Sequence, residues 1–148
     1  MFRIEGHLNL PTADQIALRF GLNNGGRVQQ AINESIIAYC KEGGYVPASP
    51  RRILEDSAIS DLENGWVVWD TPYAHYQYMG IVYGPNFPII QDGVLMGFYS
   101  PPVKHPTDRE LTYDTSQNPN AGPFWFERMK ADHLRDIIDH AKAAMRGE

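Results

Sequence analysis

Histidine, cysteine and carboxylate side chains are the groups in this sequence that could carry catalysis or bind a metal ion. Of the five histidines, no two are four residues apart, which is the spacing at which two imidazoles on one helix face ligate zinc. Asp136 and His140 do have this spacing, but a metal site needs three or four ligands and no convergent third is evident. We therefore expect a solvated helix face there, with no metal and no other cofactor.

The single cysteine and a pair of glycines are equally weak signals for chemistry. Cys40 lies at the end of an apolar helical pattern, where a small core residue is expected rather than a nucleophile. Gly25 and Gly26 precede a helix and could bind an anion, but the Lys-Ser or Lys-Thr pair of a phosphate-binding loop does not follow them. No pair of carboxylates is recognisable as acid and base. The sequence thus predicts no catalytic residues and a protein that is not an enzyme.

Length and charge narrow the class of function. A chain of 148 residues is long enough for one domain with its own hydrophobic core. The formal net charge of -5 argues against binding a nucleic acid backbone, which needs clustered Lys and Arg, although DNA could slide past an acidic wall without sticking. No apolar stretch reaches the roughly 18 residues that span a bilayer, so we expect an intracellular protein with no membrane partner.

Apolar spacing predicts three helices after a short first strand over 4–10. Thr12 and Gln15 form a capping box that opens the first helix, which ends near Phe20. A second helix is predicted from an apolar repeat that the pair Gly43 and Gly44 closes. The repeat consists of Val28, Ile32, Ile36 and Tyr39.

The third helix begins after Phe124 and is amphipathic. Ion pairs are expected between Arg128 and Asp132 and between Arg135 and Asp139, which are four residues apart. The expected apolar stripe consists of Phe126, either Met129 or Lys130, Leu134, Ile137, Ile138, Ala141 and Met145.

Two Asx-Gly pairs predict β-hairpins, because both residues of such a pair tolerate positive φ. Asn64-Gly65 separates the apolar runs SAISDL and WVVWDT, and Asp92-Gly93 separates IIQ from VLMGFY. Between the hairpins, Thr71 is expected to cap one helical turn that packs its tyrosines on the core. The segments 45–57 and 104–123 are expected as loops, with LTY at 111–113 as the one strand candidate of the second.

The second hairpin is almost free of charge. Asp92 is the only formal charge between Gln77 and Val103, although the segment is rich in large apolar side chains. A two-stranded hairpin is marginal alone, so one that is apolar on both faces needs a covering surface, either its own domain or a neighbour. The residues that we expect at a protein interface are Tyr78, Tyr83, Phe87, Ile89, Ile90, Leu95, Met96, Phe98 and Tyr99.

Six segments, in this order and spacing, carry a resemblance to a known family. They are GLNNGGRVQQAINESI, YVPAS, VVWDTPYAHYQYMGIVYGPN, GFYSPP, LTYD and AGPFWFERMKADH. Together they closely resemble the minor capsid proteins of tailed bacteriophages and prophages that form the head-tail joining, or tail-completion, group. The likeness runs from about Gly21 to Lys142, and its most specific parts are TPYA with Gly80 and the start of the last helix.

The resemblance implies a single head-tail joining domain over 1–148 with an α+β fold. A curved antiparallel sheet would pack against two long amphipathic helices, and a Pro-rich hairpin arm would lie within 84–123. The implied function is that of a structural virion protein of the phage neck, assembled in the cytoplasm of the bacterial host. As a ring subunit it would join the head connector to the tail tube. Its partners would be other copies of itself, the adjacent connector or stopper protein and the tail tube, and DNA would pass through without sequence-specific binding.

Two other functions are compatible with the sequence. One is a small hydrolase or nucleotide-binding enzyme that uses His75 or His133, which predicts a deep pocket lined by at least two ionisable groups. The other is a capsid-binding or host-factor interaction module that acts as a monomer or dimer.

Overall fold

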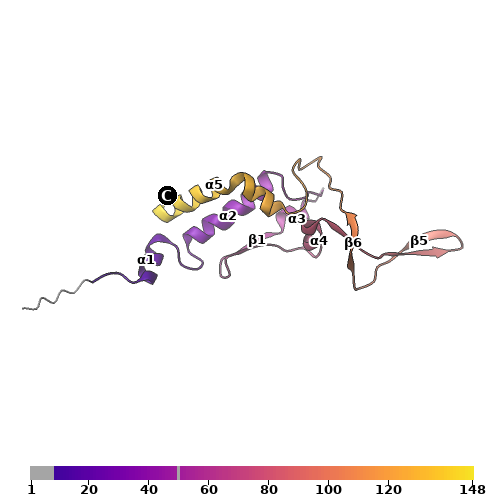
Figure 1. Ribbon diagram of the computed structural model, residues 1–148, viewed down its shortest axis with the longest axis horizontal. Coiled ribbons are helices and arrows are strands. Elements are labelled where there is room, and N and C mark those ends of the chain that lie inside the picture. The colour runs from indigo at the N-terminus through magenta and orange to yellow at the C-terminus, as the bar shows by residue number, and fades with distance from the viewer. Residues whose placement is uncertain (1–8, 50) are drawn as a thin grey trace, which may run out of the picture.

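The computed structural model describes residues 9–49 and 51–148. Most of the strand predicted over 4–10 lies outside these residues, and the segment 9–12 has no regular structure. The molecule is elongated, with a layer of helices along one part and a β-hairpin that projects from the opposite end (Figure 1). The fold combines helices with small antiparallel sheets, as expected for the α+β class.

The helices predicted from capping and apolar spacing are present. α1 (Ala13–Phe20) begins with the predicted capping box of Thr12 and Gln15. α2 (Arg27–Glu42) and α5 (Trp125–Arg146) lie side by side and run in opposite directions (Figure 1). Arg27 at the start of α2 fixes this pairing, because its Nε donates to the carbonyl of Ala144 near the end of α5 at 2.6 Å.

The core forms where α2 and α5 meet the segment that follows α2. Its most buried side chains include Cys40, Val46, Leu54, Trp125 and Met129. Cys40 is therefore a core residue, as its place in the helical pattern predicted.

α5 buries only part of the stripe that its sequence predicted: Met129 and Ile137 are buried and Phe126 packs against the core, but the stripe also included exposed positions. Trp125, Met129 and Ile137 face the core, whereas Leu134 and Ile138 are exposed. α5 has apolar residues on more of its surface than one stripe, and the position of α2 decides which of them are covered. The expected ion pair of Arg128 with Asp132 is also wrong, because Arg128 donates instead to the carbonyls of Pro123 and Asn120, both at 2.7 Å.

Within the described residues, six strands form three separate two-stranded antiparallel sheets rather than one curved sheet. β1 (Ala58–Asp61) pairs with β2 (Trp66–Trp69), and β4 (Phe87–Gln91) pairs with β5 (Val94–Tyr99). Both hairpins lie where their Asx-Gly pairs predicted them, but the first closes with a four-residue loop, 62–65, in which Gly65 has positive φ and Asn64 does not. β3 (Ile81–Gly84) pairs with β6 (His105–Glu110).

The loop predictions were partly wrong. The strand after residue 104 is β6 and not the LTY segment, because pairing with β3 supplies the hydrogen bonds that the local sequence did not suggest. A short helix, α3 (Ile53–Asp56), interrupts the loop predicted over 45–57.

The helical turn after the first hairpin is present but begins later than predicted. α4 (Ala74–Met79) starts after Tyr73, and the buried hydroxyl of Thr71 has no hydrogen-bond partner among the described residues, so Thr71 is not a side-chain cap. The Tyr76 ring packs against Tyr83, with 4.8 Å between ring centroids, and is not part of the core.

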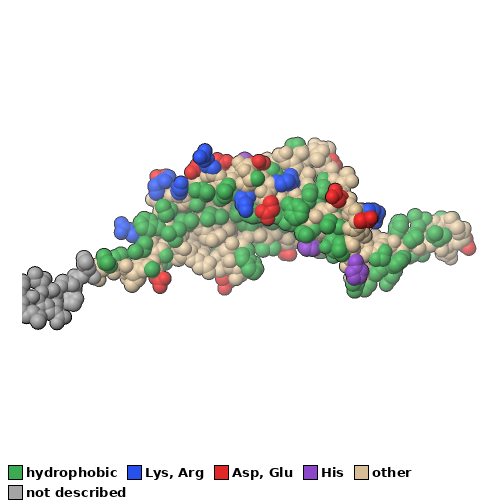
Figure 2. Space-filling view, in the orientation of Figure 1, with side chains coloured by type: hydrophobic (Ala, Val, Ile, Leu, Met, Phe, Trp, Pro, Cys, Tyr) green, Lys and Arg blue, Asp and Glu red, His purple; other side chains and the backbone are tan. Residues whose placement is uncertain are grey.

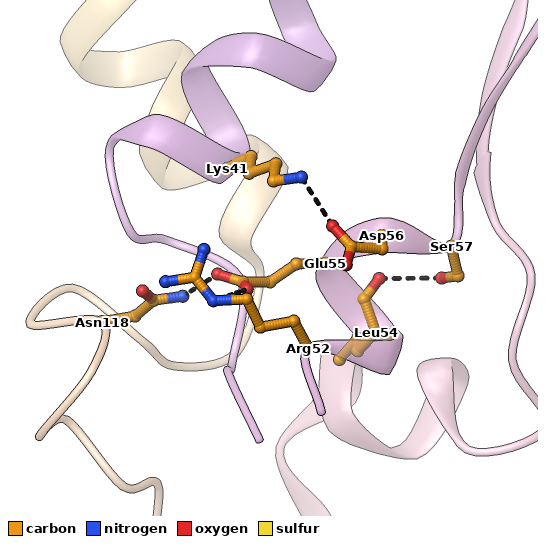
Figure 3. A network of polar contacts seen from close by, with 7 residues as sticks. All are labelled: Lys41, Arg52, Leu54, Glu55, Asp56, Ser57 and Asn118. Atoms are coloured by element: carbon orange, nitrogen blue, oxygen red, sulfur yellow. Dashed lines mark hydrogen bonds and ion pairs between the residues drawn. The ribbon is translucent and has the colours of Figure 1, made fainter. Parts of the chain in front are cut away.

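A buried carboxylate holds the long loop before α5 against α3 (Figure 3). Glu55 accepts a hydrogen bond from the side-chain amide of Asn118, and Arg52 Nε lies 3.6 Å from its other oxygen. Asn118 also donates to the carbonyl of Val46 at 2.7 Å. On the surface beside them, Lys41 pairs with Asp56 at 2.5 Å. These contacts hold together the end of α2 with the residues after it, α3, and the loop around Asn118.

Candidate protein interface

The projecting hairpin of β4 and β5, residues 87–99, is the most unusual surface of the molecule, and we call it the arm. Its tip is a two-residue turn in which Asp92 and Gly93 both have positive φ, 50° and 78°. This turn matches the right-handed twist of paired strands and explains the Asp-Gly pair. Met96 is the extra residue of a β-bulge, because Ile89 pairs with Gly97 while Ile90 pairs with Leu95.

Both faces of the arm are apolar, and both are open to solvent. Directly paired residues of an antiparallel ladder share one face, which places Phe87 with Tyr99 and, on the opposite face, Ile90 with Leu95. The large apolar side chains of both faces are 49–64% exposed. They are Phe87, Ile89, Ile90, Val94, Leu95, Met96, Phe98 and Tyr99. Apolar surface covers much of the arm up to its tip, which is polar and carries an acidic side chain (Figure 2). The chain's own body therefore covers neither face.

The base of the arm is held firmly. β3 leads directly into it and is fixed by its pairing with β6, where Thr107 Oγ1 donates to the carbonyl of Val82 at 2.7 Å. Lys104 Nζ donates to the carbonyl of Pro85 at 3.0 Å and to the side chain of Asn86, so the outgoing and returning chains are tied together. The arm is thus an ordered projection from a fixed base.

The two tyrosines predicted at the interface lie in different surroundings. Tyr83 is partly exposed at the arm's base, beside the rings of Tyr76 and His75. Tyr78 lies in the body, where its ring meets that of Trp125 edge-on at 4.7 Å and its hydroxyl donates to Glu127 at 3.2 Å. Burial, and then the nearby Glu127 carboxylate, raise the pKa of Tyr78 to about 12. The structure therefore brings eight of the nine predicted interface residues together and sets Tyr78 apart.

Two of the histidines lie along the contact of α2 with α5. Tyr39 stacks on His133 with 4.5 Å between ring centroids, and His133 Nδ1 lies 3.1 Å from the carboxylate of Asp136. His140 Nδ1 lies 2.9 Å from Ser35 Oγ, which resembles a nucleophile and its base.

The hydrogen bonds of Ser35 favour a structural role for that pair. Ser35 Oγ also lies 2.7 Å from the carbonyl of Ala31, which can only accept. The single hydroxyl proton therefore goes to Ala31, and His140 donates to Ser35 through its Nδ1 proton. In that arrangement His140 cannot act as the base for this hydroxyl.

An apolar cleft lies between α2, the β1–β2 hairpin and the start of α5, and we call it the body cleft. It has a volume of about 390 Å³, and its apolar lining includes Ile32, Ile36, Val67, Trp69 and Phe126. Tyr78 contributes the one titratable group among its lining residues. This is not the pair of ionisable groups that a hydrolase using His75 or His133 predicts.

The β1–β2 hairpin adds exposed apolar side chains that sequence reasoning missed. Ile59, Trp66 and Val68 point away from α2 and are exposed. The run WVVW could have predicted this exposed apolar face, because it has no polar residue on either face of the strand. A hairpin with one covered face usually alternates apolar and polar residues.

Within residues 9–49 and 51–148, no three His, Cys, Asp or Glu side chains are grouped so that they could hold a metal ion. None of the helices described is both long and apolar enough to cross a membrane. Comparisons of the chain with protein-family models, curated proteins and solved structures found no significant match.

Proposed function

We propose that this chain is a structural subunit of the neck of a tailed phage, where it joins the head connector to the tail tube as part of a ring. The observation that carries the proposal is the arm, whose two apolar faces are both uncovered. Removing apolar surface from water contributes about 25 cal/mol per Å², so covering the arm with a partner is strongly favourable. Among assemblies, the neck is favoured by the six segments that resemble head-tail joining proteins.

Assembly into a ring would also explain why the strands of one chain form separate pairs. In a two-stranded sheet each strand keeps one unpaired edge, and such edges are templates for pairing with another chain. We propose that neighbouring subunits join these edges into the curved antiparallel sheet, which would pack against α2 and α5 as its two long amphipathic helices. The net charge of -5 suits the wall of a channel through which DNA passes without binding.

The Phe98→Asp variant tests the proposal in the phage that encodes the chain. Phe98 is exposed, so the added carboxylate leaves the isolated subunit folded, but it would be desolvated at a covered interface. We expect loss of infectious titre, accumulation of heads without tails in electron micrographs, and an unchanged melting temperature of the purified chain.

Two variants control for nonspecific effects. Phe98→Tyr keeps the apolar area and should keep the titre, and Ile53→Asp places the same charge on an exposed apolar position of α3 and should also keep it. An unchanged titre with Phe98→Asp would refute the proposal.

The second candidate, a capsid-binding or host-factor module that acts as a monomer or dimer, is favoured by the same exposed arm. Location separates the two. Gold label on this chain at the head-tail junction fits the neck, whereas label spread over the shell fits the module.

A further inference from the structure

We propose that the arm of one copy seats in the body cleft of the next copy. This inference rests on the proposed function, because it names the surface that the arm covers within the ring. Three observations carry it: the area of the arm, the absence of charge in the cleft, and the hydrogen bonds that the cleft's polar groups already make within the chain.

The exposed area of the arm is that of an interface. Eight apolar side chains are 49–64% exposed. With roughly 150–200 Å² for a large apolar side chain, the arm offers on the order of 800 Å². This equals the roughly 800 Å² that each partner contributes to a stable protein interface. This area is the sum over both faces of the arm, so it reaches the size of a stable interface where a partner covers both faces.

The body cleft matches the arm in charge. No side chain that lines the cleft carries a formal charge at neutral pH, and the arm carries only Asp92 at its tip. Four other clefts in the described part of the chain are each lined by at least one charged side chain. Examples, one from each cleft, are Asp114, Asp132, Lys104 and Glu34. Covering a charge with an apolar strand costs free energy, because the charge loses its water. The apolar side chains of the arm form no ion pair or hydrogen bond that would offset this cost. The uncharged cleft is thus the favoured seat.

Most of the polar groups that line the cleft already form hydrogen bonds within the chain itself. Gln29 Nε2 donates to Asn33 Oδ1 at 2.8 Å, and Asn33 Nδ2 donates to Ser60 Oγ and to the carbonyl of Trp66, both at 3.1 Å. A polar ligand would have to break these bonds, whereas apolar side chains lose nothing by lying beside them. An apolar occupant fits this lining better than a polar small molecule.

The arm and the body cleft belong to different copies. The arm leaves the end of the molecule and points away from the helical body (Figure 1). Two different surfaces then meet at each contact, which makes the contact heterologous. Contacts of this type repeat from copy to copy and close into a ring when the rotation allows.

Crosslinking between two variants in assembled particles tests this contact. One variant carries Leu95→Cys, on the arm face that also presents Ile90 and Phe98, and the other carries Val67→Cys in the cleft. Both variants are supplied together during assembly, and purified particles are treated with a short bismaleimide linker. Because each chain carries one introduced thiol, a Leu95–Val67 crosslink can form only between copies. Peptide mass spectrometry identifies the linked positions.

The chain offers a matched control for this experiment. Val68→Cys changes the same residue type one position along the same strand, on the face turned away from α2. The natural Cys40 is fully buried, so chains without an introduced cysteine show whether it reacts. We expect a Leu95–Val67 crosslink and its loss when Val68→Cys replaces Val67→Cys.

Each other outcome decides between the two proposals. Particles that contain the chain but yield Leu95–Leu95, Leu95–Val68 or no crosslinks overturn the arm-in-cleft contact and leave the neck function standing. Absence of the wild-type chain from the particles overturns the neck function itself. Incorporation of each variant into infectious particles shows that it has folded.

Discussion

At the scale of single residues, the body is held by buried polar contacts that tie distant segments together. The Tyr45 hydroxyl donates to Asp132 on α5, and the guanidinium of Arg128 lies 5.8 Å from the centre of the Tyr45 ring. The hydrogen bond to Asp132, and then burial, raise the pKa of Tyr45 from 10.0 to about 12. Few of these contacts follow from local sequence, because their partners lie tens of residues apart.

The raised pKa of Tyr45 predicts how stability depends on pH. Between pH 10 and 12 the unfolded chain has released this proton while the folded chain still holds it, so the free energy of unfolding falls as the pH rises. Below pH 10 the contribution is fully present. Tyr45→Phe should lower the stability at pH 7 by about 1 kcal/mol, through loss of the hydrogen bond, and should weaken the decline between pH 10 and 12.

Thermal denaturation at a series of pH values measures this effect. Tyr99→Phe removes a hydroxyl from an exposed ring on the arm and should follow the wild-type curve. If the stability of Tyr45→Phe fell between pH 10 and 12 as steeply as that of the wild type, Tyr45 would not be a source of the instability at alkaline pH.

At the scale of elements, the two hairpins each place a glycine at positive φ, but they differ in loop length and in surroundings. Gly65 and Gly93 both have positive φ, 72° and 78°. A side chain in this left-handed region costs about 1 kcal/mol. The β1–β2 hairpin packs on α2, whereas the arm stands free. The same substitution should therefore have different consequences in the two turns.

Gly65→Ala should destabilise the whole molecule, and Gly93→Ala only the arm. We expect Gly65→Ala to lower the melting temperature by about 2–4 °C. Gly93→Ala should leave the melting temperature unchanged and speed hydrogen exchange of the β4 and β5 amides roughly fivefold, because the arm opens without the body. A fall in melting temperature with Gly93→Ala would show that the arm unfolds together with the body.

Elements specified by neighbouring residues could be predicted from the sequence. The Thr12 capping box and both Asx-Gly turns act over two to four residues, and the structure has them where they were predicted. β6 could not be predicted, since HPTDRE contains a proline and three charged residues and is a strand only because β3 lies beside it. The buried stripe of α5 was likewise decided by the position of α2.

The exposure of the arm was easier to predict than much of the fold around it. A long segment with one formal charge and many large apolar residues predicts uncovered surface from composition alone, and the exposed arm agrees with that pattern. Tyr78 belongs to the same uncharged segment in sequence, but its ring packs on Trp125, a contact between segments nearly fifty positions apart. Composition could not distinguish that environment from the arm's.

At the scale of the whole molecule, the exposed apolar surface is divided between the arm and the body. Besides the arm, the outer face of the β1–β2 hairpin and the positions Leu134 and Ile138 of α5 are uncovered, and α1 buries none of its residues. Monomeric proteins rarely expose contiguous apolar patches beyond a few hundred Å². This distribution supports a subunit that makes contacts along its length.

Replacing the arm should separate folding from assembly. If residues 87–99 are exchanged for a short Gly-Ser linker between Asn86 and Ser100, the body keeps its core, because the core residues come from α2, α5 and the segments 45–46, 54 and 74. We expect the melting temperature to stay within the few degrees that about 1 kcal/mol represents, and binding of an apolar dye to fall. The shortened chain should be incorporated into particles far less than the wild type when both are supplied together. A matched variant that carries Gly93→Ala retains the arm's apolar residues and should compete better than the linker variant. Equal incorporation of the wild type and the shortened chain would mean that the arm is not what holds the subunit in its assembly, and the apolar surfaces of the body would then have to supply that contact.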